Sequence, residues 1–139
     1  MTYFYQLGDM EKHGFSGNVT SSYGVQVQGE AMFIGLANKP RGSGSRPHTH
    51  PIEQFNYVLK GMLKAKVGDE EALVGPGGLI HIPAHVVHTV VATGEEDAVF
   101  LVVKDKRTAY KIEAADGDQT AGPLYEPGFG PQAAASKAG

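Results

Sequence analysis

Hydrophobic and polar residues alternate along the middle of the chain, in short runs that Gly and Pro separate. Positions 25–28 alternate valine with glutamine, a Gly-Glu pair follows at 29–30, and 31–37 is an apolar run. Side chains of a β-strand point to opposite faces in turn, so this pattern predicts two strands joined as a hairpin.

The same kind of pattern continues toward the C-terminus. Residues 55–60 and 62–67 both have strand character and are separated by Gly61, which predicts a second hairpin. Further strands are predicted at 72–74, 79–82, 86–92 and 98–103. The last of these is the longest apolar run and is expected to be a central strand. No segment has the period of an amphipathic helix, and many short strands predict an all-β sandwich or barrel.

The pattern divides one domain into three parts. Residues 1–30 are expected to form an N-terminal arm and edge strands, 31–113 the barrel core, and 114–139 an extended, partly disordered C-terminal tail.

Within that tail, Pro and Gly are dense over 123–131, so this stretch is expected neither to join a ladder nor to form a helix. Tyr125 and Phe129 are expected to anchor it to the barrel surface. Residues 132–139 are small and polar, and we expect them to be disordered.

Composition narrows the function classes. The chain has 139 residues and no cysteine, which excludes disulfides, thiolate metal sites and a thiol nucleophile. A formal net charge of -3 provides no field for nucleic acid. The N-terminus lacks the pattern of a secretion signal, and no apolar stretch reaches a membrane-spanning length. We therefore expect a cytoplasmic protein without nucleic-acid or membrane partners.

Histidines are the candidate chemistry. His48 and His50 are separated by one residue, so on a strand both point to the same face. His88 follows an apolar run and lies 38 residues after His50, where a neighbouring strand can deliver a third imidazole to one metal ion.

The spacing around the first two histidines matches a known motif. Gly42, His48, His50, Gln54 and Gly61 stand at the positions of the first motif of the cupin superfamily, with Gln54 replacing the usual Glu.

The second cupin motif is matched less fully. Gly77, Pro83 and His88 stand at its positions, whereas His85 stands where Gly is usual and Ala92 where Asn is usual. Both motifs occur in the expected order with a short segment between them, and the chain thus resembles a small single-domain cupin.

The resemblance implies a fold and a site. The fold would be a double-stranded β-helix, a jelly-roll-like antiparallel barrel of six to eight strands, often paired as a homodimer. The metal ligands would be His48, His50 and His88, with Gln54 as the fourth. One divalent transition metal is implied, and Fe, Mn, Ni, Zn and Cu all suit imidazole ligands.

Gln54 has a consequence for the substrate. Its amide cannot ionise, so a dication among neutral ligands keeps its full charge and favours a small anionic substrate. Glu53 is one residue out of phase and is expected to point outward or to lie behind the ligands.

Other polar residues near the motifs are weaker candidates. His81 and His85 are candidate catalytic groups, and Asn56 shares the parity of Gln54 and is a candidate pocket residue. Arg41 and Arg46 precede the strand that is expected to carry His48 and His50, and we expect them to be charged loop residues exposed to solvent.

The leading hypothesis for function is a metal-dependent oxygenase acting on a small enolisable or aromatic oxygen-bearing substrate. One alternative is a redox-neutral cyclase, isomerase or lyase that resembles the small cupins acting as polyketide cyclases. Another is a non-catalytic protein that binds a small ligand in its barrel. The fold does not choose among these.

Overall fold

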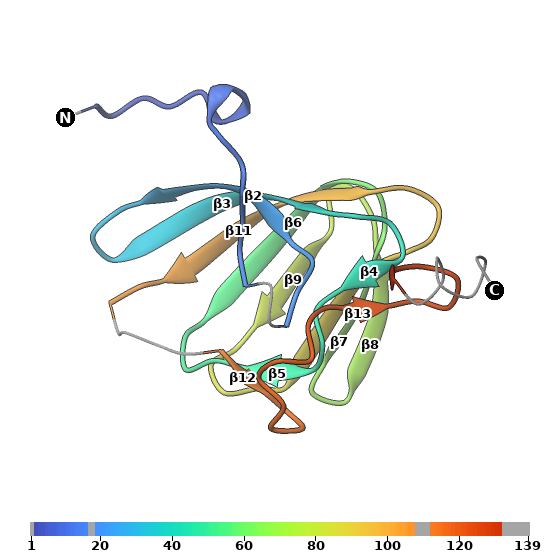
Figure 1. The fold of residues 1–139 in the computed structure, drawn as a ribbon. Helices are drawn as coiled ribbons and strands as arrows, with labels where there is room; N and C mark the ends of the chain where they lie inside the picture. Colours follow the sequence, from blue (N-terminus) through green and yellow to red (C-terminus); the bar gives the residue numbers. More distant parts are fainter. Residues whose placement is uncertain (1, 17–18, 108–111, 132–139) are drawn as a thin grey trace.

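Strands dominate the computed structural model, which describes residues 2–16, 19–107 and 112–131. Two antiparallel sheets enclose a shared hydrophobic core (Figure 1). A 3₁₀ turn, η1 (Leu7–Asp9), precedes them. No helix within these ranges is long and apolar enough to cross a membrane. The prediction of an all-β antiparallel fold is confirmed.

The first sheet contains the longest strands. Its order is β1 (His13–Gly14), β2 (Tyr23–Gln28), β3 (Met32–Lys39), β11 (Ala98–Asp105), β6 (Gln54–Lys60) and β9 (Leu79–Ile82). The predicted central strand is confirmed, because β11 lies between β3 and β6. The predicted N-terminal hairpin is formed by β2 and β3, which pair as far as Gln28 and Phe33.

The second sheet is built around β10 (His88–Ala92). This strand pairs with β7 (Leu63–Val67) along its length, and with the short strands β5 (His48–Thr49) and β4 (Ser43–Gly44) along its other edge. The sheet is extended by β8 (Glu70–Val74) beside β7, β12 (Glu113–Ala114) beside β5 and β13 (Leu124–Tyr125) beside β4.

Both sheets supply the core from their inward faces. The two-residue period of the strands explains this, because alternate side chains of β10 and β11 are apolar and point inward. The buried core cluster consists of Ala37, Val58, Leu63, Ala65, Ile80, Ile82, Val90, Ala92, Ala98, Phe100 and Val102.

The predicted hairpin around Gly61 is wrong. β6 pairs with β11 and β9, whereas β7 pairs with β10 and β8, so the chain crosses from one sheet to the other at Gly61. Gly61 has φ +79, and a Cβ there would stand 2.9 Å from the Cα of Ala98. Only glycine allows this turn and this close approach of two backbones.

The prediction that 123–131 cannot join a ladder is also wrong. Leu124 and Tyr125 form β13 and pair with Gly44 and Ser43 of β4. The anchoring role predicted for Phe129 is confirmed, because its ring lies against the backbone of Gly42 and Gly94. Residues 132–139, expected to be disordered, lie outside the described residues.

Candidate metal centre

The four predicted ligands come together on the inner side of the barrel. His48 belongs to β5 and is the direct cross-strand partner of His88 at the start of β10. His50 follows β5, and Gln54 begins β6 in the other sheet. All four side chains are buried. The two sheets thus converge on one site at the mouth of the core.

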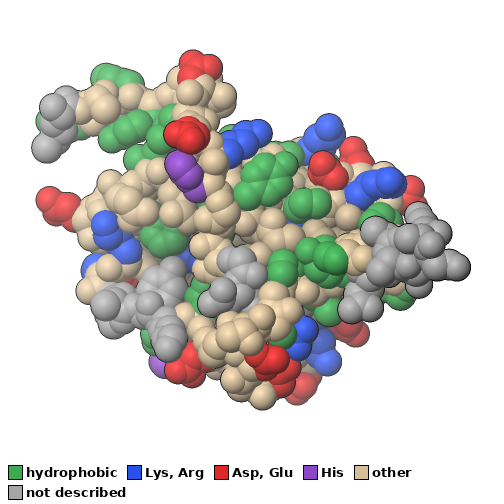
Figure 2. All heavy atoms as spheres, in the orientation of Figure 1, with side chains coloured by type: hydrophobic (Ala, Val, Ile, Leu, Met, Phe, Trp, Pro, Cys, Tyr) green, Lys and Arg blue, Asp and Glu red, His purple; other side chains and the backbone are tan. Residues whose placement is uncertain are grey.

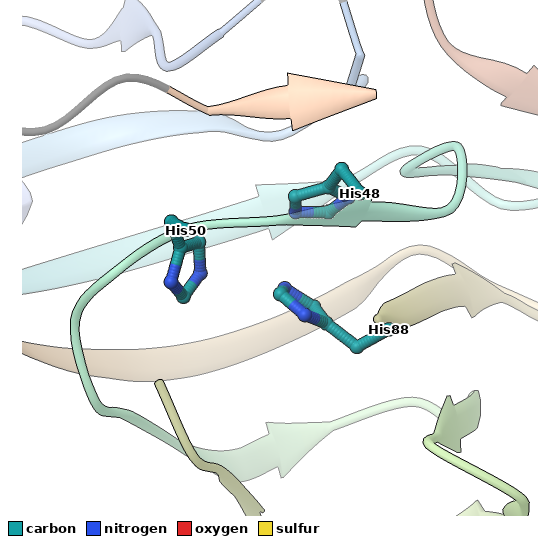
Figure 3. Close-up of side chains that lie close together, drawn as sticks. All are labelled: His48, His50 and His88. Atoms are coloured by element: carbon teal, nitrogen blue, oxygen red, sulfur yellow. The ribbon is translucent and has the colours of Figure 1, made fainter. Parts of the chain in front are cut away.

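The three imidazoles face one another (Figure 3). Candidate ligand nitrogens of His48, His50 and His88 all lie within 4.8 Å of one another. Ring centroids are 4.2 Å apart for His48 and His88, and 4.8 Å apart for His50 and His88. The spacing of these atoms allows one metal ion to be shared by the three rings.

Each ring is oriented by a main-chain carbonyl through its Nδ1 atom. His48 Nδ1 lies 2.5 Å from the Arg46 carbonyl oxygen, His50 Nδ1 2.9 Å from that of Ile52, and His88 Nδ1 2.9 Å from that of Val86. A carbonyl only accepts hydrogen bonds, so Nδ1 carries the proton and Nε2 presents its lone pair. This is the tautomer that a metal ion bound at Nε2 requires.

Burial keeps the imidazoles neutral. It is the main cause that lowers the pKa of His48 to about 4 and that of His88 to about 3, and it also lowers the pKa of His50. Neighbouring imidazoles and the Lys104 ammonium act in the same direction. At neutral pH the three rings are therefore available as ligands rather than protonated.

Gln54 completes the donor set. Its Nε2 donates to Asn56 Oδ1 at 2.7 Å, which turns its Oε1 toward the histidines, 3.0 Å from His50 Nε2. Both nitrogens of His50 therefore face an acceptor oxygen, and in the tautomer with the proton on Nδ1 the lone pairs of His50 Nε2 and Gln54 Oε1 would both be available to a divalent ion. Three nitrogens and one amide oxygen fit a divalent transition metal. Asn56 is buried beside Gln54, where it sets the orientation of this ligand.

The weaker candidates lie away from this cluster. His81 projects outward from β9, where its Nε2 lies 2.8 Å from Glu53 Oε2 and its ring stacks on Phe55 at 4.6 Å. His85 is exposed and has φ +68, at a position where glycine is usual in the motif. Its backbone N–H donates to the His50 carbonyl at 2.8 Å. His85 thus joins the two motifs through its main chain.

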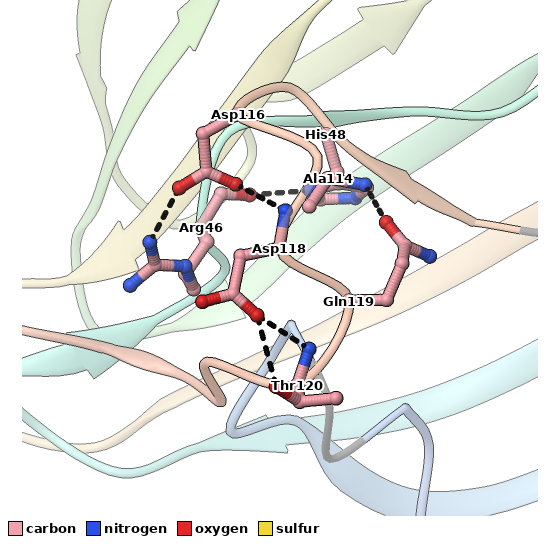
Figure 4. A network of polar contacts seen from close by, with 7 residues as sticks. All are labelled: Arg46, His48, Ala114, Asp116, Asp118, Gln119 and Thr120. Carbon is pink, nitrogen blue, oxygen red and sulfur yellow. Dashed lines mark hydrogen bonds and ion pairs between the residues drawn. The ribbon is translucent and has the colours of Figure 1, made fainter.

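The two flanking arginines also point away from the site. Arg41 is exposed and lies over the Phe129 ring. Arg46 pairs with Asp116 at 2.8 Å in a loop that also contains Asp118 and Thr120 (Figure 4). This loop follows β12, which pairs with β5, so the C-terminal segment holds the strand that carries His48.

A cavity of about 60 Å³ adjoins the donor set and is lined by His48, His88, Gln54 and Asn56. Lys39 and Lys104 line it as well, and the sequence analysis did not single them out. The signal that could have found them is the alternation of side chains along each strand. Lys39 lies on the same face of β3 as Phe33 and Ala37. Lys104 lies on the same face of β11 as Phe100 and Val102.

Comparison with known proteins agrees with this geometry. A family model described as Cupin domain matches residues 36–104. The crystal structure of TT1209 from Thermus thermophilus is 32% identical, with 59% of this chain and 79% of that chain covered and a TM-score of 0.55. No curated protein matches the chain significantly.

Two solved structures match over more of the chain. The polyketide cyclase RemF from Streptomyces resistomycificus is 20% identical, with 86% and 91% of the two chains covered and a TM-score of 0.69. A cupin-2 domain from Rhodospirillum rubrum is 20% identical, with 84% of each chain covered and a TM-score of 0.65. The family model, the two sheets and the histidine cluster agree, and the chain belongs to the cupin superfamily.

Proposed function

We propose that this cupin is a metal-dependent enzyme acting on a small, anionic, enolisable substrate. One observation carries the proposal, namely the convergence of His48, His50 and His88 with Gln54 Oε1 on one buried site. All four donors are neutral, so a divalent ion there keeps its charge and attracts an anion.

Redox-neutral chemistry fits this cavity best, as isomerisation, cyclisation or lysis. A bound ion supplies Lewis acidity toward a substrate carbonyl or enolate. Burial lowers the pKa of Lys39 to about 7 and that of Lys104 to about 8, so both can exchange protons near neutral pH. Both line the cavity, whereas Gln54 cannot act as a base. The polyketide cyclase that shares the fold supports this choice.

An oxygenase acting on an enolisable or aromatic oxygen-bearing substrate is the second candidate. It is favoured by the donor set itself, because an ion held by His48, His50, His88 and Gln54 would have fewer protein ligands than six and could supply redox chemistry toward a substrate. The two candidates share the site and differ in the metal and in the need for oxygen.

The metal site is tested by substitution. His50→Ala and His88→Ala should each lower the divalent metal content of protein purified without added ions by at least about tenfold, because each removes a ligand. His13→Ala is the matched control, since His13 is exposed on β1. Elemental analysis gives the content and circular dichroism checks the fold. A folded wild type that takes up no divalent ion contradicts the proposal.

The reaction class is tested with small keto acids, diketones and catechols, in air and without oxygen. Turnover without oxygen by a zinc or manganese protein supports the redox-neutral proposal. Oxygen uptake by an iron or copper protein supports the oxygenase instead. Tight binding of one of these compounds that survives chelation, without any turnover, indicates a non-catalytic binding protein and contradicts an enzymatic role.

A further inference from the structure

Lys39 is a buried cation that does not belong to the proposed metal ligands. It ends β3, its side chain is only 2% exposed, and it lines the cavity that adjoins the histidines. Its Nζ donates to Thr20 Oγ1 at 3.2 Å and lies 5.8 Å from the centroid of the Phe100 ring. Lys39 thus points its charged group into the barrel.

No carboxylate compensates this charge in the part of the chain that the structure describes. The side chains that line the cavity include two lysines and neither aspartate nor glutamate, and no ion pair among the described residues includes Lys39. Burying an ammonium without a counter-ion is costly. That cost falls when an anion enters the cavity.

A chain of hydroxyls extends from Lys39. Thr20 Oγ1 accepts from Lys39 and from the Ser22 backbone N–H, and donates to Ser22 Oγ at 3.2 Å. The Ser22 hydroxyl keeps its own hydrogen, which no described residue accepts, and Ser22 lines the cavity with 7% exposure. Lys39 has further N–H groups to donate, since an ammonium carries three. Two sets of donors therefore face the cavity.

The size of the cavity limits what these donors can hold. Its volume is about 60 Å³, enough for a small polar group such as a carboxylate. Phe15 and Ile112 also line it and are partly exposed, so the rest of a larger molecule would have to extend past them.

We propose that Lys39 and Ser22 form a carboxylate-binding subsite inside the barrel. The ligand carries a carboxylate that is separate from the oxygen bound at the metal centre, as in a small keto acid or dicarboxylate. Its identification as the substrate rests on the proposed function. The anion site itself consists of protein groups and exists without the metal.

Malonate is the probe, titrated into chelator-treated, ¹⁵N-labelled protein at about pH 6, where Lys39 is an ammonium. We expect saturable shifts of amides around Lys39 and Ser22, and none with neutral malonamide. Lys39→Met should weaken malonate binding at least about tenfold, and Ser22→Ala severalfold. Lys64→Met is the matched control, because Lys64 is exposed on β7, and it should bind malonate like the wild type.

Metal content is measured on the same variants and separates the two proposals. Lys39→Met should retain the metal of the wild type, because Lys39 is not a ligand. If Lys39→Met binds malonate as tightly as the wild type, or if chelation abolishes binding to the wild type, the subsite is overturned. A wild type that takes up no divalent ion when purified or when ions are added, but still binds malonate through Lys39, overturns the proposed enzyme and supports the subsite.

Discussion

At the scale of single residues, main-chain carbonyls orient the three histidines of the candidate metal site. The carbonyls of Arg46, Ile52 and Val86 lie at hydrogen-bonding distance from the three Nδ1 atoms. Gln54 is instead oriented by a side chain, that of Asn56. The ring orientations therefore depend on the backbone at positions 46, 52 and 86.

Lys39 gives the protein a pH-dependent stability. Burial first, and the charge of Lys104 second, lower its pKa from 10.5 in the unfolded chain to about 7 in the folded protein. Between these values the unfolded state binds the extra proton, so the free energy of unfolding rises with pH. The free energy of unfolding of the wild type, relative to that of Lys39→Met, should rise by about 1.4 kcal/mol per pH unit in this range.

The measurement is urea unfolding of chelator-treated protein between about pH 7 and 9.5, a window inside the two pKa values. Lys104 titrates in both proteins, but it is coupled to Lys39, so the difference reports Lys39 together with this coupling. The difference in free energy of unfolding between the wild type and Lys64→Met should not change with pH, because Lys64 is exposed. A wild-type gain that does not change with pH would show that Lys39 is not desolvated.

The histidine cluster was predictable from the sequence and the two lysines of the cavity were not. The spacing of His48, His50 and His88 follows from strand parity and motif order, and the structure brings them together with Gln54. Lys39 and Lys104 stand near strand ends, where lysine usually extends into solvent. The alternation places both lysines on the inward face, but their burial could be predicted only if the opposite sheet were known to cover that face.

At the scale of elements, β5 is held between β10 and the C-terminal segment. The strand has two residues and pairs with β10 through His48 and with β12 through His48 and Thr49. The Arg46–Asp116 ion pair (Figure 4) adds to this support. A hydrogen bond from the Ala115 N–H to the Pro47 carbonyl does so as well. The tail therefore helps to position His48, a candidate metal ligand.

Asp116→Ala should weaken metal binding slightly, because it releases Arg46, whose carbonyl orients His48. The ion pair is partly exposed, so we expect an effect of about fivefold at most. Asp118→Ala is the control, since Asp118 bonds through its side chain only to Thr120 in the same loop. Competition with a chromogenic chelator measures the affinity. A loss as large in Asp118→Ala would show that loop folding, not the ion pair, matters.

Strand positions were easier to predict than strand partners. The alternation over 55–60 and 62–67 correctly indicates β6 and β7, but it reports which face each residue takes and not which strand lies beside it. Gly61 reads as a hairpin turn in the sequence, and in the structure it is a crossing point against Ala98. Such a contact between distant segments has no local signal.

At the scale of the whole molecule, the N-terminal segment stands away from the barrel. Figure 1 shows it projecting beyond the sheet edge, and Figure 2 shows hydrophobic side chains along it. Tyr3 is 78% exposed and Phe4 88% exposed. Aromatic side chains gain about 1.5–3 kcal/mol when they are fully buried, so this segment favours contact with another surface.

We propose that the surface belongs to a second copy of the chain and that the protein is a homodimer. Phe4→Ser should raise the dimer dissociation constant at least tenfold, which corresponds to about 1.4 kcal/mol of lost burial. Leu73→Ser is the control, because Leu73 is 65% exposed on β8, away from the N-terminal segment. Sedimentation equilibrium measures both. If Leu73→Ser dissociates the dimer and Phe4→Ser does not, the interface lies at β8 instead. A wild type that is monomeric at micromolar concentration would contradict the dimer.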